Sequence, residues 1–129
     1  MPPLRRHRFG RIGEKLALLL LLFKGYRLRN RNWRGAGGEI DLVMERRGEI
    51  VFVEVKARSS EDFGGAAAAL DEKKKKTLTR VSAAYLGRFS LWESPCRYDL
   101  VTVEKLRGVV PWRIRHYRNV FRPDAGRLF

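Results

Sequence analysis

The stretch GEIDLVMERRGEIVFVEVKAR, from Gly38 to Arg58, predicts two β-strands joined by a short turn. Its Val, Ile and Phe residues are typical of strands. Because successive side chains of a strand point to opposite faces, the apolar residues 50–53 indicate that the second strand is buried on both sides. Asp41, Glu54 and Lys56 interrupt this apolar pattern. Buried charges need partners, so these three residues predict a functional site at one end of the strand pair.

The register of the two strands decides whether the carboxylates meet. If Glu45 pairs with Ile50 around the turn, Asp41 lies directly opposite Glu54. Opposed residues on antiparallel strands have Cβ atoms about 4.5–5.5 Å apart. Two carboxylates at that separation repel each other unless a cation lies between them. Oxygen ligands suit Mg²⁺ or Mn²⁺, so the pair predicts a divalent cation site.

Alternatives to this arrangement remain open at the level of sequence. The same register places Glu39 opposite Lys56, whereas a three-residue loop with Gly48 in a left-handed conformation would place Val53 opposite Asp41. The two carboxylates could also lie exposed at a sheet edge, or the second could pair with a neighbouring lysine or arginine. The ionic end of a strand that is otherwise buried on both faces favours the site interpretation.

A third carboxylate heads the first expected helix, which covers residues 10–24. The residues three, four, seven and eight positions after Glu14 are all apolar. A lone carboxylate at the head of an apolar face needs a partner or a role. Glu14 could interact with the positive N-terminus of its helix, or it could reach a metal ion held by the strands.

The charge distribution indicates a polyanionic partner. The net charge is +14, from 28 Lys and Arg against 14 Asp and Glu. Residues 1–34 contribute +9, residues 105–129 contribute +6, and residues 35–104 contribute −1. Nucleic acid is the expected partner, ahead of an anionic membrane or a purely solubilising role for the basic ends.

Cysteine content and the apolar run limit the cellular context. One cysteine, Cys96, excludes an intrachain disulfide and favours a reducing cytoplasm. The run LALLLLLF, residues 16–23, follows several arginines but is too short for a bilayer, which needs about 20 apolar residues. We therefore expect a buried helix here and no membrane partner.

The order of elements predicts one α/β domain over residues 1–129, with a mixed sheet flanked by helices. Residues 1–9 are expected to form a flexible basic arm, and Gly25 is expected to end the first helix. The second helix is expected to begin at Ala66 or Asp71 and to end at Leu86. The expected strands cover residues 26–33, 39–45, 49–57, 97–103 and 112–121.

Several motifs together resemble the YraN family. This is a family of small predicted nucleases in the PD-(D/E)XK, restriction-endonuclease-like superfamily. The resemblance covers residues 11–121 and implies an αβββαβ core. It is carried by Gly13-Glu14, Gly38-Glu-Ile-Asp41, Phe52-Val-Glu-Val-Lys56, Arg58, the lysines at 73–76 and Arg97-Tyr-Asp-Leu-Val101.

The resemblance also implies residue roles. Asp41 and Glu54 would hold a catalytic Mg²⁺ or Mn²⁺, together with the backbone carbonyl of Val55. Lys56 would orient the attacking water and stabilise charge on the phosphate. Glu14 resembles a helix glutamate of the Holliday-junction-resolvase-like branch, where it completes the metal site.

Further basic residues are candidates for nucleic-acid contacts. Arg34 in the glycine-rich loop could clamp nucleic acid, and Arg58 could touch phosphate or pair with an acid. The lysines at 73–76 span a full helical turn, so they cannot all face one way; a solvated face is the alternative. The resemblance singles out the first lysines of this helix, and Lys73 is the residue chosen. Asp99 is expected to form an ion pair.

These observations predict a metal-dependent endonuclease that hydrolyses phosphodiester bonds in DNA, including branched or repair intermediates. Because cutting a duplex or a junction usually takes two active sites, a homodimer is an expected assembly. One alternative is a non-catalytic nucleic-acid-binding protein that retains the nuclease fold. Another is a basic protein that docks on RNA or on other proteins, which leaves the acidic pair unexplained.

Overall fold

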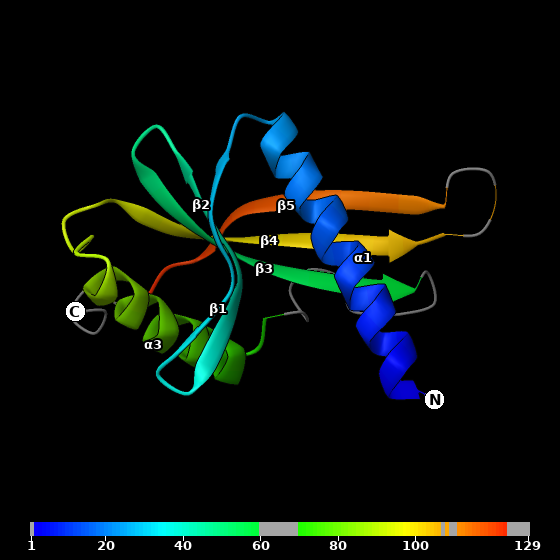
Figure 1. Cartoon of the computed structure of the whole chain (residues 1–129), viewed down its shortest axis with the longest axis horizontal. Helices are drawn as coiled ribbons and strands as arrows, with labels where there is room; N and C mark the ends of the chain where they lie inside the picture. Colours follow the sequence, from blue (N-terminus) through cyan, green and yellow to red (C-terminus); the bar gives the residue numbers. More distant parts are fainter. Residues whose placement is uncertain (1, 60–69, 107, 109–110, 124–129) are drawn as a thin grey trace.

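The computed structural model of the chain describes residues 2–59, 70–106, 108 and 111–123. A five-stranded sheet forms its centre (Figure 1). The strands lie in sequence order, with β3 and β4 parallel and all other neighbours antiparallel, so the sheet is mixed and the fold is α/β as predicted. The elements are α1 (Pro2–Phe23), β1 (Arg27–Gly35), β2 (Gly38–Arg46), β3 (Glu49–Ser59), α3 (Glu72–Arg88), β4 (Cys96–Lys105) and β5 (Trp112–Phe121).

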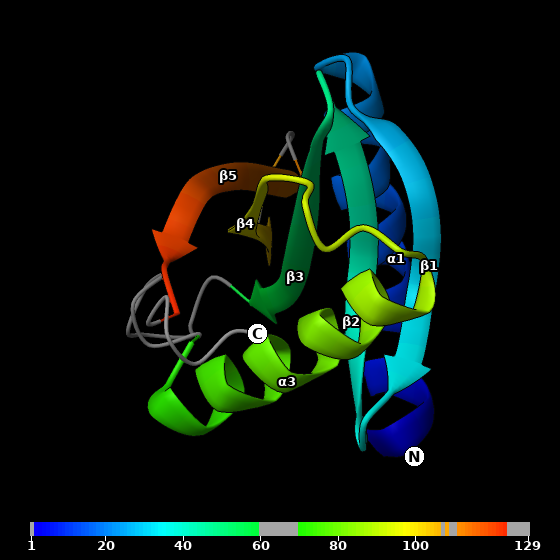
Figure 2. The ribbon, with the colours of Figure 1, turned by 90° about the vertical axis from the view of Figure 1, so that its left-hand side faces the viewer.

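Helices α1 and α3 cover opposite faces of the sheet (Figure 2). Strand β3 therefore has an apolar layer on each side, which confirms the prediction that its first half is doubly buried. Alternation along the strand sends its odd and even residues to different helices. The α3 layer contains Ile50, Phe52, Leu78, Val81 and Tyr85, and the α1 layer contains Ala17, Leu21, Val51 and Val53.

The turn between β2 and β3 sets the register of the strand pair. Arg47 and Gly48 both have positive φ, 52° and 82°, as the two-residue turns that match the twist of antiparallel strands require. Glu45 pairs with Ile50, as predicted. The alternative register, which would have placed Val53 opposite Asp41, is wrong, since Val53 pairs with Leu42.

Helix α1 begins earlier than expected. The expectation of a loose arm over residues 1–9 is wrong for residues 2–9, whose backbone is helical. Proline is tolerated in the first turn of a helix because its missing N–H would have no partner there, so Pro2 and Pro3 do not oppose the extension. The helix ends where predicted: Gly25 has a φ of 92°, and the Tyr26 N–H donates to the Leu21 carbonyl.

Helix α3 begins at the second of the two predicted starts. Asp71 is its N-cap, with a side chain that accepts a hydrogen bond of 2.8 Å from the Lys74 N–H. Such a cap satisfies one of the free N–H groups of the first turn. The other predicted start, Ala66, lies outside the described residues. The helix continues to Arg88, two residues past the predicted end.

Candidate functional site

The site lies where β2 and β3 separate. The two strands are paired as far as Leu42 and Val53. Beyond that point β2 stays paired with β1 and β3 with β4, and the β1–β2 hairpin turns away from β3 (Figure 1). Asp41 and Glu54 are the first residues past this point. The expected pairing of Glu39 with Lys56 is wrong, because Glu39 follows β2 and pairs with Arg34.

Asp41 links the two diverging strands. Its Oδ2 accepts a hydrogen bond of 2.8 Å from the Val55 N–H. Burial raises the pKa of Asp41 from 3.8 to about 7, and the nearby charge of Glu54 adds to the rise. A carboxyl group that is costly to ionise beside a second carboxylate is typical of a site that binds a proton or a cation.

Glu54 is buried at the edge of the α3 layer. It is only 3% exposed, so the alternative of a carboxylate at an open sheet edge is wrong. Its Oε2 lies 3.0 Å from Lys74 Nζ and 3.9 Å from Lys56 Nζ. Its Oε1 is buried without a hydrogen-bond partner among the described residues. Because buried oxygens are almost always satisfied, this one marks a place for a proton, a water or a cation.

The lysine of α3 that reaches this site is Lys74, whereas the sequence analysis selected Lys73, and only as a phosphate contact. Lys73 is exposed, whereas Lys74 turns towards the sheet. Burial acts to lower the pKa of Lys74, but the carboxylates of Glu54, Asp41 and Glu39 outweigh it and raise the pKa. A signal for this was present, since Lys74 lies four residues before the core residue Leu78, on the same helix face. A phosphate contact by Lys73 remains a prediction.

Glu14 lies beside the pair. Gly13 lets α1 cross β3 closely, because a Cβ there would lie 3.0 Å from the Cβ of Ala57. Burial raises the pKa of the Glu14 carboxyl, and the charge of Asp41 raises it further. With its amide nitrogen turned towards them, Asn32 lies 3.2 Å from Oε1 of both Glu14 and Glu39. Carboxylates from α1, β2 and β3 thus lie near one another at this end of the strand pair.

The carboxylates are close, but they do not surround a common point. Within the described ranges, no three His, Cys, Asp or Glu side chains are arranged to hold a metal ion together. The charge of Glu54 raises the pKa of Asp41, and both residues lie just beyond the last pair of β2 and β3. They are the residues that could hold a divalent cation, since Glu54 Oε1 has no hydrogen-bond partner among the described residues. Metal ligation by Glu14 and by the Val55 carbonyl stays a prediction.

Asn32 was not identified from the sequence. It sits in β1 between the pairs Arg31–Leu42 and Trp33–Ile40, and therefore faces Asp41 across the strands. Its φ is 50°, a left-handed value that non-glycine residues other than Asn, Asp and His seldom adopt. Strained backbone of this kind clusters at functional sites, and here it turns an amide towards two carboxylates.

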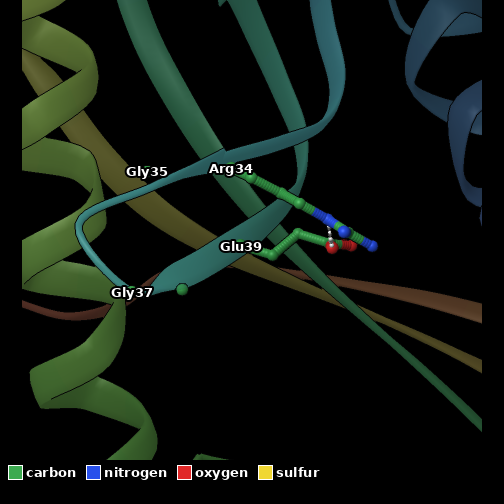
Figure 3. A pocket seen from close by; sticks show the side chains of 5 residues that line it. Arg34, Gly35, Gly37 and Glu39 are labelled. Carbon is green, nitrogen blue, oxygen red and sulfur yellow. Dashed lines mark hydrogen bonds and ion pairs between the residues drawn. The ribbon is translucent and has the colours of Figure 1, made fainter.

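Arg34 borders an open recess at the β1–β2 turn (Figure 3). The recess has a volume of about 400 Å³ and is lined by Arg34, Gly35, Gly37, Gly38 and Glu39. The Arg34 side chain is 82% exposed, and its Nε lies 2.8 Å from Glu39 Oε2. Exposed guanidinium donors next to a concave surface suit contacts with phosphate. The structure thus places Arg34 on the same hairpin as Asp41.

Arg58 lies further along β3, where its neighbour on β4 is Glu104. It is part-exposed near the end of the strand. A contact with phosphate remains a prediction for this residue.

Asp99 belongs to a separate buried network. Its carboxylate accepts hydrogen bonds of 2.8 and 3.0 Å from Arg97, and lies 2.7 Å from His116 Nε2. Burial alone would raise the pKa of Asp99, but the His116 and Arg97 hydrogen bonds hold it below its usual value. The predicted ion pair is confirmed. Because these groups satisfy one another, the network stabilises β4 and β5.

The α/β fold, with an acid pair where two central strands part, is consistent with the restriction-endonuclease-like class. The chain belongs to the uncharacterised protein family UPF0102, whose model matches residues 13–103. This confirms the YraN resemblance. Because the family description names no activity, the function has to be inferred from the site.

Relatives in distant bacteria cover most of the chain. A UPF0102 protein of Moorella thermoacetica is 44% identical over 109 residues, which is 81% of this chain and 91% of the relative. One of Phocaeicola vulgatus is 36% identical over 115 residues, covering 89% and 93%. One of Neisseria meningitidis is 44% identical over 101 residues, covering 78% and 88%.

In the part of the chain that the structure describes, no helix is both long and apolar enough to cross a bilayer.

Proposed function

We propose that this protein is a metal-dependent nuclease that hydrolyses phosphodiester bonds in DNA. The observation that carries the proposal is Glu54, a buried carboxylate near Asp41 that two lysines flank and whose Oε1 has no hydrogen-bond partner in the described part of the chain. With a divalent cation held by the two carboxylates, such a site could offset the negative charge that builds on a phosphate during hydrolysis.

Asp41 and Glu54 would hold a Mg²⁺ or Mn²⁺ ion. A bound divalent ion would lower the pKa of a coordinated water and offset charge on the phosphate. Lys56, whose side chain is 36% exposed and directed to the same end of β3, would orient the water and donate to a phosphate oxygen. Asp41 also keeps Val55 in place through its hydrogen bond to the backbone, so it positions the end of β3.

Substrate binding would come from cations around the acids. Arg34 is exposed on the β1–β2 hairpin, and Lys73 is exposed on the first turn of α3. With a net charge of +14, the protein attracts a polyanion, and each phosphate contact releases counter-ions. Duplex DNA and branched repair intermediates are the proposed substrates, and a homodimer would supply two sites to such a substrate.

Cleavage of a labelled panel tests the proposal. The panel contains duplex, single-stranded, flap and four-way-junction DNA, together with RNA, in Mg²⁺ or Mn²⁺. We expect metal-dependent cutting that falls by about 10²-fold or more in Glu54→Gln and in Lys56→Gln. Glu72→Gln is the matched control, because the Glu72 side chain is 83% exposed on α3. Equal cutting by all variants would reject the proposed site.

A non-catalytic nucleic-acid-binding protein is the second candidate. Two observations favour it: no three metal-ligating side chains converge among the described residues, and Lys74 already neutralises Glu54. For such a protein, removing a carboxylate would only remove repulsion of phosphate. Binding without cutting, tightened in Glu54→Gln at every metal concentration, would therefore identify this second function.

A further inference from the structure

Two lysines flank Glu54, but their contacts differ. Lys74 Nζ lies 3.0 Å from Glu54 Oε2, within the range of a charge-assisted hydrogen bond. Lys56 Nζ lies 3.9 Å from the same oxygen, beyond hydrogen-bond distance. The two lysines also come from different elements, Lys56 from β3 and Lys74 from α3. Lys74 is therefore the closer of the two cations and the one that hydrogen-bonds the buried carboxylate.

The first turn of α3 holds Lys74 in this position. Asp71 accepts a hydrogen bond from the Lys74 N–H, which fixes the phase of the helix at its start. In that phase Lys74 lies on the face that also carries Leu78, so its side chain points to the sheet. Its ammonium also experiences the charges of Asp41 and Glu39. The Lys74 ammonium therefore interacts with the charges of three carboxylates, those of Glu54, Asp41 and Glu39.

We propose that the Lys74 ammonium is the resident counter-ion of the Asp41–Glu54 pair, and that it competes with a divalent cation for the negative charge of the pair. This inference rests on the proposed metal-dependent function. It follows from geometry: a cation shared by the two carboxylates needs the negative charge of Glu54 that Lys74 already offsets. Two cations at one carboxylate repel each other, so their occupancies compete.

The chemistry of lysine suits such an exchange. A buried glutamate without a counter-ion is costly, so a tethered ammonium stabilises the fold when no metal is bound. The four-carbon stem is flexible, and the side chain is 36% exposed, so the ammonium can swing into solvent without disturbing the backbone of α3. A rigid arginine fork at this position would be harder to displace.

The test is Mn²⁺ binding to the full chain without nucleic acid, followed by electron paramagnetic resonance. We expect Lys74→Gln to bind Mn²⁺ about tenfold more tightly than wild type. Lys73→Gln removes the same charge one residue away from an exposed position, and should change the affinity by less than about twofold. Lys74→Arg retains the charge and should bind no more tightly than wild type.

Thermal unfolding in metal-free buffer supplies a second readout. Lys74→Gln should melt at a lower temperature than Lys73→Gln, because it leaves Glu54 without its ion-pair partner. Saturating Mn²⁺ should remove this difference, since the metal would then neutralise the same carboxylate. A melting temperature equal to that of Lys73→Gln in metal-free buffer would contradict a counter-ion role.

The outcomes separate this inference from the proposed function. Mn²⁺ binding that Glu54→Gln abolishes, but that is equally tight in Lys74→Gln and Lys73→Gln, would overturn only the competition between Lys74 and the metal. No binding in wild type with clear binding in Lys74→Gln would support it strongly. No Mn²⁺ binding in any variant would overturn the metal-dependent function and this inference together.

Discussion

Replacing Asp41 with asparagine should make the protein more stable above neutral pH. Burial and the charge of Glu54 raise the pKa of Asp41 from 3.8 to about 7. Between these values the folded state keeps a proton that the unfolded chain has lost. The free energy of unfolding of the wild type should therefore fall as pH rises from about 4 to 7. Asparagine has no proton to lose, and its amide oxygen can still accept the hydrogen bond from Val55.

The size of the effect follows from the same shift. A difference of one pH unit corresponds to about 1.4 kcal/mol while only the unfolded carboxyl is ionised. From pH 4.5 to pH 7 this gives roughly 3 kcal/mol, and partial solvent screening lowers it, so we expect Asp41→Asn to gain about 2–3 kcal/mol over wild type by pH 8. Urea unfolding in EDTA at pH 4.5 and pH 8 measures the gain directly.

The control and the metal dependence make this prediction specific. Glu72→Gln removes an exposed carboxylate, and its stability relative to wild type should be nearly the same at both pH values. Adding Mn²⁺ at pH 8 should stabilise the wild type more than Asp41→Asn, because the variant lacks one ligand of the pair. A gain in Asp41→Asn that is the same at pH 4.5 and pH 8 would refute a raised pKa at this position.

Three further predictions concern the packing around Gly38, the buried network of Asp99 and the exposed side chain of Arg34. Gly38→Ala should lower the free energy of unfolding by about 1–3 kcal/mol, because its Cβ would lie 2.7 Å from Val81 Cγ2; Gly10→Ala, with open space around its Cβ, should not. Asp99→Asn should cost about 3–5 kcal/mol in urea unfolding, since it leaves buried arginine and histidine partners uncompensated. Arg34→Gln should weaken DNA binding and reduce by about one the slope of log affinity against log salt; an unchanged slope would place Arg34 outside the interface.

The local features of the fold could be read from residue patterns. The register of the β2–β3 pair stayed open in the sequence, where a left-handed Gly48 belonged to the rival register, and the structure decided it. The continuous apolar run of residues 50–53 did identify β3 as buried on both faces. Such features depend on residues that are close together in the chain, so they can be recognised from the sequence. The helical backbone of residues 2–9 was not predicted, because the basic residues there were taken to indicate a flexible arm. Charged residues nevertheless form helices readily.

The site was only partly visible in the same way. Asp41, Glu54 and Lys56 stood out because charges interrupt an apolar pattern. Lys74 was missed among four lysines, since its direction depends on where Asp71 starts the helix. Asn32 was missed because its role comes from a left-handed backbone angle inside a strand, which no residue pattern indicates.

The sequence by itself determined the α/β class, the family, the paired acids and the basic character of the chain, because each depends on residue type and short-range spacing. The tertiary structure decided what surrounds the acids. It separated β2 from β3 just beyond their last pair, placed Lys74 on Glu54, and left Glu54 Oε1 without a hydrogen-bond partner among the residues that the structure describes. These features involve β2, β3 and α3, and they depend on how the two halves of a twisted sheet part and where α3 is capped.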